Sequence, residues 1–243
     1  MDLAYEAGVS PKHLSFVETG RSKPSPELLL TLAHHLDVPL RDRNSLLLAA
    51  GYAPRYHETP MDDPATERVR SSLERLLATH DPYPGVVLNR RWDVVLFNRA
   101  AAGLVAGVPT HLTQPTMNIF RISLHPEGLA AITLNFGDWA TYMLSQLRRL
   151  VAMSGDPELA DLEREVLAYP NVAAFVTDGL AEEWDDTQLL VPCRLSVGGN
   201  DLSLFTTLTT FGTPRDITLD ELAVELFFPA DAHTDTILRT ATS

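Results

Sequence analysis

The chain has 243 residues, of which 45% are hydrophobic and 21% charged, so it can bury one or two sizeable cores. A single cysteine excludes an internal disulfide framework and a cysteine-rich metal site, and the lack of a leader-like or membrane-length apolar run predicts a cytoplasmic protein. The net charge is −13, yet residues 1–57 carry equal numbers of acidic and basic side chains. This asymmetry predicts two domains with different partners, the second unsuited to nucleic acid.

Residues 8–24, GVSPKHLSFVETGRSKP, predict the turn and second helix of a helix-turn-helix. Gly8 can end one short helix, Ser10 is a good N-cap and Pro11 fits the first position of the next helix. Side chains on the exposed faces of that helix can reach a major groove, and the cations that follow it are placed for phosphates. The predicted DNA contacts are Ser10, Pro11, Lys12, His13, Ser15, Phe16, Arg21 and Lys23.

Two further helices are predicted, one over residues 25–36 and one over 41–50, which gives a small all-α DNA-binding domain of four helices at residues 1–57. The stretch that follows, APRYHETPMDDPAT, contains three prolines and is typical of a linker. Helical spacing of apolar residues then returns over Glu67–Thr79. We therefore expect residues 58–83 to form a linker and a connecting helix.

From Pro84 onward the pattern changes to the two-residue period of strands. A β-hairpin is predicted over residues 86–97, followed by a small capped helix, Asn98–Val105. A long amphipathic helix is predicted over Phe136–Met153, and Asp156-Pro157 starts a second, acidic helix.

Two more strands, at residues 189–197 and 202–211, flank Gly198-Gly199-Asn200-Asp201, which is a hairpin turn signal. Cys193 falls on the apolar face of the first strand and is predicted to be a small buried hydrophobe.

The segment 222–228 fits a helix, because Thr218 and Glu221 mimic a capping box, but its composition suits a strand. We favour a fifth strand, followed by a C-terminal helix from Asp231. Residues 84–243 are thus predicted to form an antiparallel sheet with packed helices, and the whole chain is α+β.

Six segments, taken in order, carry a resemblance to a known family: GVSPKHLSFVETGRSKPS, RDRNSLLLAAGYAP, NRRWDVVLFNRAA, NIFRISLHPEGL, LSLFTTLTTFGTPRDITLDELAVE and FFPAD. Together they resemble the MmyB-like bacterial transcription regulators over nearly the whole chain. The resemblance implies an XRE-class helix-turn-helix module of five helices and a PAS-like sheet domain with helices packed on one face. It also implies an apolar pocket for a fatty-acid-like molecule. Because the family pattern begins upstream of Met1, we expect the helix-turn-helix to lack its first helix and the start of its second.

The sequence itself also offers the lining of an apolar pocket, on the long helix and on the strands. Arg121 is the candidate for binding a carboxylate, because a guanidinium can donate two parallel hydrogen bonds. An internal ion pair with an Asp or Glu is an equal alternative for Arg121, and a place in the core is the alternative for each apolar residue. The predicted ligand contacts are Phe97, Arg121, Trp139, Met143, Leu147, Phe205, Leu208 and Phe211.

Catalytic and metal-binding motifs are not found in the sequence. His125 is isolated, while His34 and His35 are adjacent and point to different sides of a helix. The acidic residues at 182–186 lack the ligand spacing and the glycine of a calcium loop. We therefore predict no enzyme, no metal and no cofactor beyond the apolar ligand.

The expected function is transcriptional regulation by a homodimer that binds operator DNA and senses the fatty-acid-like molecule, with no membrane partner. The alternative is a sensor or carrier of apolar ligands that no longer binds DNA because its helix-turn-helix is incomplete.

Overall fold

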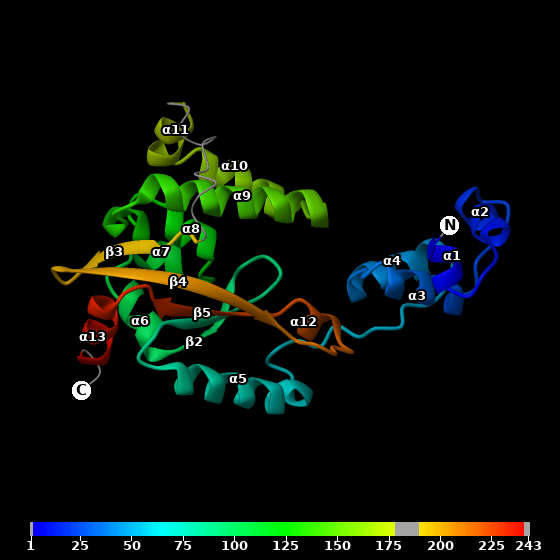
Figure 1. Cartoon of the computed structure of the whole chain (residues 1–243), viewed down its shortest axis with the longest axis horizontal. Coiled ribbons are helices and arrows are strands. Elements are labelled where there is room, and N and C mark those ends of the chain that lie inside the picture. Colours follow the sequence, from blue (N-terminus) through cyan, green and yellow to red (C-terminus); the bar gives the residue numbers. More distant parts are fainter. Residues whose placement is uncertain (1, 178–189, 241–243) are drawn as a thin grey trace. The chain divides into compact units, whose positions relative to one another are not determined.

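The computed structural model describes residues 2–177 and 190–240, and these form two compact units (Figure 1). The first unit comprises Met1–Glu67 together with Phe211–Glu221, and the second comprises Arg68–Thr210 together with Leu222–Ser243. This division differs from the predicted one, because the proline-containing stretch joins the first unit and a segment from far along the chain returns to it. The acidic residues at 182–186 and the start of the predicted strand at Leu189 lie outside the described residues.

The helices predicted for the DNA-binding domain are confirmed. They are α1 (Asp2–Glu6), α2 (Pro11–Glu18), α3 (Pro26–His35) and α4 (Leu40–Ala49). Hydroxyls cap α2 and α3, since Ser10 Oγ accepts a hydrogen bond from the His13 N–H and Ser25 Oγ accepts one from the Leu28 N–H. The unit also contains the short helices η1 (Pro64–Thr66) and α12 (Ile217–Asp220). Its buried apolar side chains include Ala4, Leu28, Leu32, Ala33, Leu40 and Leu47.

The stretch predicted as a linker is held against α4 by a buried amide. Asn44 Oδ1 accepts hydrogen bonds from the N–H groups of Arg55 and Tyr56, and Asn44 Nδ2 donates to the carbonyl oxygen of Tyr56. Three hydrogen bonds from one buried side chain fix the chain direction immediately after the helix. These residues therefore belong to the folded unit and are not a loose tether.

The second unit is built on a five-stranded antiparallel sheet with the order β2-β1-β5-β4-β3. The strands are β1 (Gly85–Leu88), β2 (Val94–Phe97), β3 (Cys193–Val197), β4 (Asn200–Thr210) and β5 (Ala223–Pro229). Both predicted hairpins and the favoured fifth strand are thereby confirmed. Gly198 and Gly199 both have positive φ, at 57° and 82°, and they form the two-residue turn that pairs Val197 with Asn200.

Helices lie on both faces of this sheet, whereas the resemblance implied only one covered face (Figure 1). On one face α5 (Glu67–His80) packs so closely that a Cβ added at Gly85 would stand 3.0 Å from Leu77 Cδ2. On the other face lies α9 (Phe136–Ser154), which ends at Gly155 as predicted. The remaining helices of the unit are α6 (Arg99–Val105), α7 (Thr110–Thr113), α8 (Ile119–Leu124), η2 (Leu129–Ile132), α10 (Pro157–Leu167), α11 (Pro170–Thr177) and α13 (Ala232–Thr240).

The main core fills the space between the sheet and helices α8, α9 and α10. Phe120 is fully buried there, and its ring centroid lies 5.0 Å from that of Trp92. Cys193 is buried in the same core, and this burial raises the pKa of its thiol to about 12. The prediction of a small buried hydrophobe at this position is confirmed.

Candidate DNA-binding helix and ligand pocket

The candidate recognition helix, α2, buries none of its side chains completely. Lys12, His13 and Ser15 are exposed, while Phe16 is half-buried, with Lys12 Nζ lying 5.6 Å from its ring centroid. The adjoining Ser10 and Pro11 are exposed as well. A short helix that packs one face against its own domain and exposes polar side chains on its other faces can enter a major groove.

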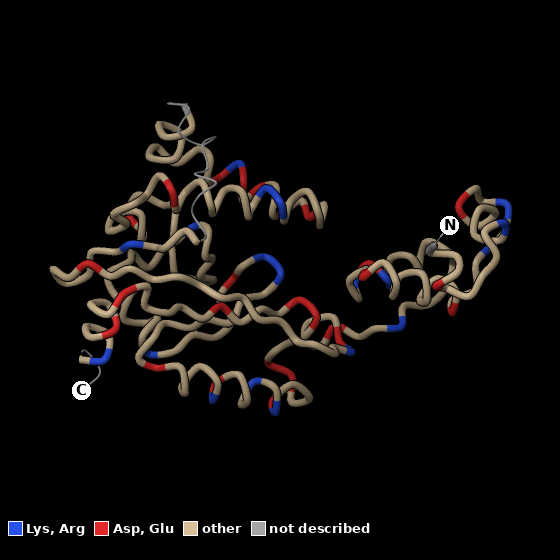
Figure 2. The backbone as a smooth tube through the Cα atoms, viewed as in Figure 1, with Lys and Arg blue, Asp and Glu red and all other residues tan. Residues whose placement is uncertain are grey.

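The turn after α2 presents the other predicted DNA contacts. The N–H groups of Arg21 and Ser22 both donate to the carbonyl oxygen of Phe16, which closes the helix and leaves Arg21 exposed. Lys23 Nζ instead lies 4.5 Å from the ring centroid of Tyr52, the residue that follows Gly51 at the end of α4. Figure 2 shows Lys and Arg at α2 and in the turn after it.

The predicted ligand contacts do not surround one cavity. Trp139, Met143 and Leu147 are buried in the main core, at 5%, 1% and 0% exposure. Phe97 and Leu208 are half-exposed, at 50% and 53%.

Two of the predicted contacts lie elsewhere. Phe205 stacks on Phe228, with ring centroids 5.5 Å apart. Because side chains alternate along β4, Phe205 lies on the opposite face of the sheet from Leu208. Phe211 belongs to the first unit.

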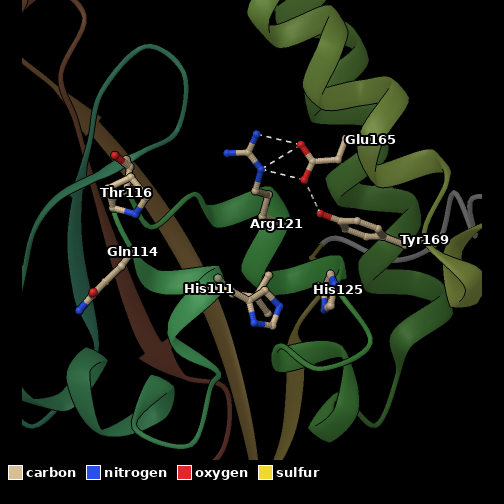
Figure 3. Close-up of a pocket in the computed structure, with 9 residues that line it drawn as sticks. His111, Gln114, Thr116, Arg121, His125, Glu165 and Tyr169 are labelled. Carbon is tan, nitrogen blue, oxygen red and sulfur yellow. Dashed lines mark hydrogen bonds and ion pairs between the residues drawn. The ribbon is translucent and has the colours of Figure 1, made fainter.

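A pocket of about 420 Å³ does occur in the second unit, and Arg121 is the predicted ligand contact that lines it (Figure 3). Its walls come from α7, from α8 and from the facing side of α10. The lining mixes ring and aliphatic surfaces with polar groups. The lining residues are His111, Leu112, Gln114, Pro115, Thr116, Arg121, His125, Glu165 and Tyr169.

Arg121 is held on α8 by the cap of that helix and by an ion pair. Asn118 Oδ1 accepts a hydrogen bond from the Phe120 N–H and so fixes the first turn of α8. Arg121 Nε donates to Glu165 Oε1 at 2.8 Å, and Arg121 Nη2 donates to Glu165 Oε2 at 2.8 Å. The hydroxyl of Tyr169 donates to Glu165 Oε1 at 2.6 Å.

These contacts set the charges in the pocket. The hydrogen bonds from Arg121 lower the pKa of Glu165, and burial raises the pKa of Tyr169. At neutral pH the pocket therefore holds an ionised Arg121–Glu165 pair beside a protonated phenol. Of the two alternatives that the sequence left open for Arg121, the structure contains the internal ion pair.

The two histidines that line this pocket lie close to a glutamate, although the sequence spacing of the three residues forms no motif. One possible ligand atom from each of His111, His125 and Glu127 lies within 4.8 Å of the other two. The backbone N–H of Glu127 already donates to His125 Nδ1 at 3.1 Å, and that bond occupies one of the candidate lone pairs. A transition metal could be held here only after that bond breaks.

A buried carboxyl group on β5 is a further site that sequence reasoning missed. Glu225 is fully enclosed, and its Oε2 has no hydrogen-bond partner within the described part of the chain. Burial raises the pKa of Glu225 to about 7. Thr206, Tyr142 and Cys193 surround it from β4, α9 and β3. The available signal was one acidic residue in the apolar run Ala223–Pro229.

Comparison with protein families finds two matches along the chain. Residues 69–241 match the MmyB-like transcription regulator ligand binding domain, and residues 2–42 match a helix-turn-helix family. The chain belongs to the MmyB-like transcription regulators. This MmyB-like chain is accordingly a DNA-binding transcription regulator with a ligand-binding domain. A comparison with curated proteins finds no match. In residues 2–177 and 190–240, no helix is long and apolar enough to cross a membrane.

Proposed function

We propose that this regulator binds operator DNA as a homodimer, through α2 and the turn after it, and that a fatty-acid-like molecule in the second unit controls binding. The observation that carries the proposal is the exposed polar surface of α2 inside the helix-turn-helix match. A dimer fits this mode because two recognition helices read two half-sites of an operator. The proposed place of action is the cytoplasm, and no catalytic step is part of it.

The proposed DNA contacts divide into two kinds. Lys12, His13, Ser15 and Phe16 lie on α2 and are assigned to bases and nearby phosphates, with Ser10 and Pro11 at its start. Arg21 and Lys23 are assigned to phosphates alone. Lys23 can serve this purpose while its ammonium stays near the ring of Tyr52, because the group remains exposed.

Replacing Arg21 by Ala is expected to weaken binding to all duplexes alike and to reduce the dependence on salt by about one counterion. Replacing Lys12 by Ala is expected to change the preferred base at one position, at a cost of roughly 1–3 kcal/mol. Binding measured against a randomised duplex pool and across a salt series separates the two effects. Arg68→Ala on α5 removes the same charge from an exposed site in the second unit and is the matched control. Equal losses in all three variants would remove the recognition assignment.

For the ligand, we assign the polar head to the pocket beside Arg121. Figure 3 shows the third guanidinium nitrogen, Nη1, pointing away from Glu165, so its two N–H groups can donate to a ligand while the ion pair stays intact. The rings of His125 and Tyr169 and the side chain of Leu112 give the pocket its apolar surface. Trp139, Met143 and Leu147 can contact an acyl chain only if the core opens, because all three are buried in it. Contacts of the ligand with Phe97, Phe205, Leu208 and Phe211 stay predictions from the sequence.

Straight-chain acids are expected to bind more tightly as they lengthen, by at most roughly 0.8 kcal/mol per methylene, until the space is filled. Arg121→Gln is expected to weaken binding of the acids more than binding of the matching alcohols, because only the acids need the cation. Calorimetry and native mass spectrometry of the purified chain measure both quantities. Flat affinity along the series, with no bound species, would contradict the proposed ligand class.

The second candidate function is a sensor or carrier of apolar ligands without DNA binding. The charge balance of residues 1–57 favours it, because a DNA-binding domain is usually basic. Ligand binding without any salt-dependent DNA binding would select this candidate over the first.

A further inference from the structure

The connection between β4 and β5 belongs to the first unit, although both strands belong to the sheet of the second. We define Phe211–Glu221 as the coupling segment. It leaves β4 after Thr210 and returns through Leu222 to β5, which lies at the centre of the strand order. The ligand-binding domain thus contributes eleven consecutive residues to the unit that contains the helix-turn-helix.

One carboxylate of the coupling segment caps α4. The residue before this helix is Pro39, which offers no side-chain cap. Asp220 Oδ2 takes that role from 180 positions away, because it accepts a hydrogen bond from the Leu40 N–H at 2.8 Å. The carboxylate satisfies an otherwise unpaired donor and places negative charge at the positive end of the helix dipole.

The next residue of the segment forms an ion pair at the same end of α4. Arg41 Nε and Nη2 donate to the two oxygens of Glu221 at 2.6 and 2.9 Å, and Arg41 Nη1 donates to Glu58 Oε2 at 2.9 Å. The Glu221 side chain is only 17% exposed, so this two-point contact is largely shielded from water.

The middle of the coupling segment is fixed to the stretch before η1. Asp216 Oδ2 accepts hydrogen bonds from the Thr59 N–H at 3.2 Å and from the Thr59 hydroxyl at 2.6 Å. The Ile217 N–H donates to the carbonyl oxygen of His57 at 2.8 Å. Hydrogen bonds and an ion pair therefore attach the segment at its middle and at its C-terminal end, and the buried side chain of Ile217 adds an apolar contribution.

The far end of α4 leads to the DNA-binding turn. The hydroxyl of Tyr52 donates to the carbonyl oxygen of Pro24 at 2.9 Å, and Lys23 Nζ lies 4.5 Å from the centroid of the Tyr52 ring. A displacement of α4 along its axis would therefore move Lys23 and the turn that contains the residues assigned to phosphates.

We propose that the coupling segment transmits the state of the ligand-binding sheet to the helix-turn-helix. It does so when the contacts of Asp220 and Glu221 with the N-terminus of α4 form or break. This inference rests on the proposed function, in which a ligand controls DNA binding. It assigns to three carboxylates, those of Asp216, Asp220 and Glu221, a role in regulation rather than in binding either partner.

Hydrogen exchange of the full chain tests the attachment first. Asp220→Asn and Glu221→Gln are each expected to speed exchange of the α4 amides by roughly fivefold, the effect of losing a cap or a comparable contact. Asp201→Asn and Glu74→Gln remove the same charges at exposed sites of the second unit and are expected to leave α4 unchanged. Unchanged exchange of α4 in Asp220→Asn and Glu221→Gln would overturn the proposal.

Transmission is tested without any ligand by a matched pair of core variants. Val224→Ala lies on β5, three residues after the segment, whereas Val166→Ala lies on α10. Both side chains are buried, at 6% and 0% exposure. Val224→Ala is expected to speed exchange in α4, and to lose this effect when Asp220→Asn and Glu221→Gln are also present. If α4 responds equally to both valine variants, or to neither, transmission through the segment is refuted.

Adding dodecanoic acid separates failure of this inference from failure of the proposed function. Protection of the second unit without any response in α4 would overturn the coupling. No response anywhere would remove the proposed ligand class, and the valine variants would still decide the coupling.

Discussion

Replacing Glu225 by Gln should abolish a loss of stability that the wild-type chain undergoes as the pH rises from about 4.5 to about 7. The buried carboxyl group favours its neutral form in the folded state, because burial raises its pKa above the ordinary value that it regains on unfolding. Below pH of about 4.5 the group is neutral in both states and imposes no penalty. Above about 7 it is ionised in both states, and the folded chain bears the full cost of a buried charge.

The size of this cost follows from linkage between proton binding and folding. The difference between the two pKa values corresponds to a loss on the order of 3 kcal/mol at neutral and alkaline pH. Urea unfolding measured at several pH values should therefore show the wild-type free energy of unfolding decreasing over this interval, and the Gln variant lacking this decrease. The slope is the decisive quantity, because the new amide brings donors of its own into a buried site.

The comparison must isolate Glu225 from other titrating groups. The carboxyls of Asp156 and Glu165 have lowered pKa values, so their ionised forms stabilise the folded state above their ordinary pKa values, and this stabilisation is lost as the pH falls. Both are present in wild type and variant, and their contributions cancel in the difference. Identical pH profiles for the two chains would show that Glu225 is not buried as a neutral acid.

Phe120→Ala should destabilise the second unit by roughly 3–5 kcal/mol, which is a large share of a typical domain stability of about 5–15 kcal/mol. The side chain is completely buried against Trp92, so its removal leaves a cavity as well as lost apolar burial. Thermal and urea unfolding measure the change.

A half-exposed apolar residue gives the appropriate control for Phe120. Leu208 is 53% exposed, and Leu208→Ala should change the free energy of unfolding by about 0.5 kcal/mol or less. Comparable losses in the two variants would place Phe120 outside the core. Phe120 lies between Asn118 and Arg121 on α8, so a loosened core should also weaken the Arg121–Glu165 pair.

Local chemistry made most of the elements predictable. Ser10 and Ser25 cap helices because a hydroxyl two or three residues before an N–H can accept its hydrogen bond, and this depends only on neighbouring sequence. The double glycine at the β3–β4 turn is similarly local, since both positions need positive φ. The strand over 222–228 was correctly favoured over a helix on composition alone.

The pocket was less predictable, because its contacts join distant residues. Arg121 pairs with Glu165 across 44 positions, and nothing in the sequence distinguishes that glutamate from its acidic neighbours on α10. The cap that Asp220 provides for Leu40 spans 180 positions. Phe205 and Leu208 cannot line one surface of the sheet, because an odd separation within a strand places two side chains on opposite faces.

The return of Phe211–Glu221 to the first unit bears on how such regulators exchange parts during evolution. A DNA-binding domain that is contiguous in sequence can be replaced by a single recombination event. Here, residues 1–67 alone would lack the carboxylates of Asp216, Asp220 and Glu221, which would remain with the strands of the sensor. A chimera with a different DNA-binding domain must therefore preserve Arg41, Thr59 and the backbone N–H of Leu40. Otherwise, two separate stretches of the gene must be exchanged at once.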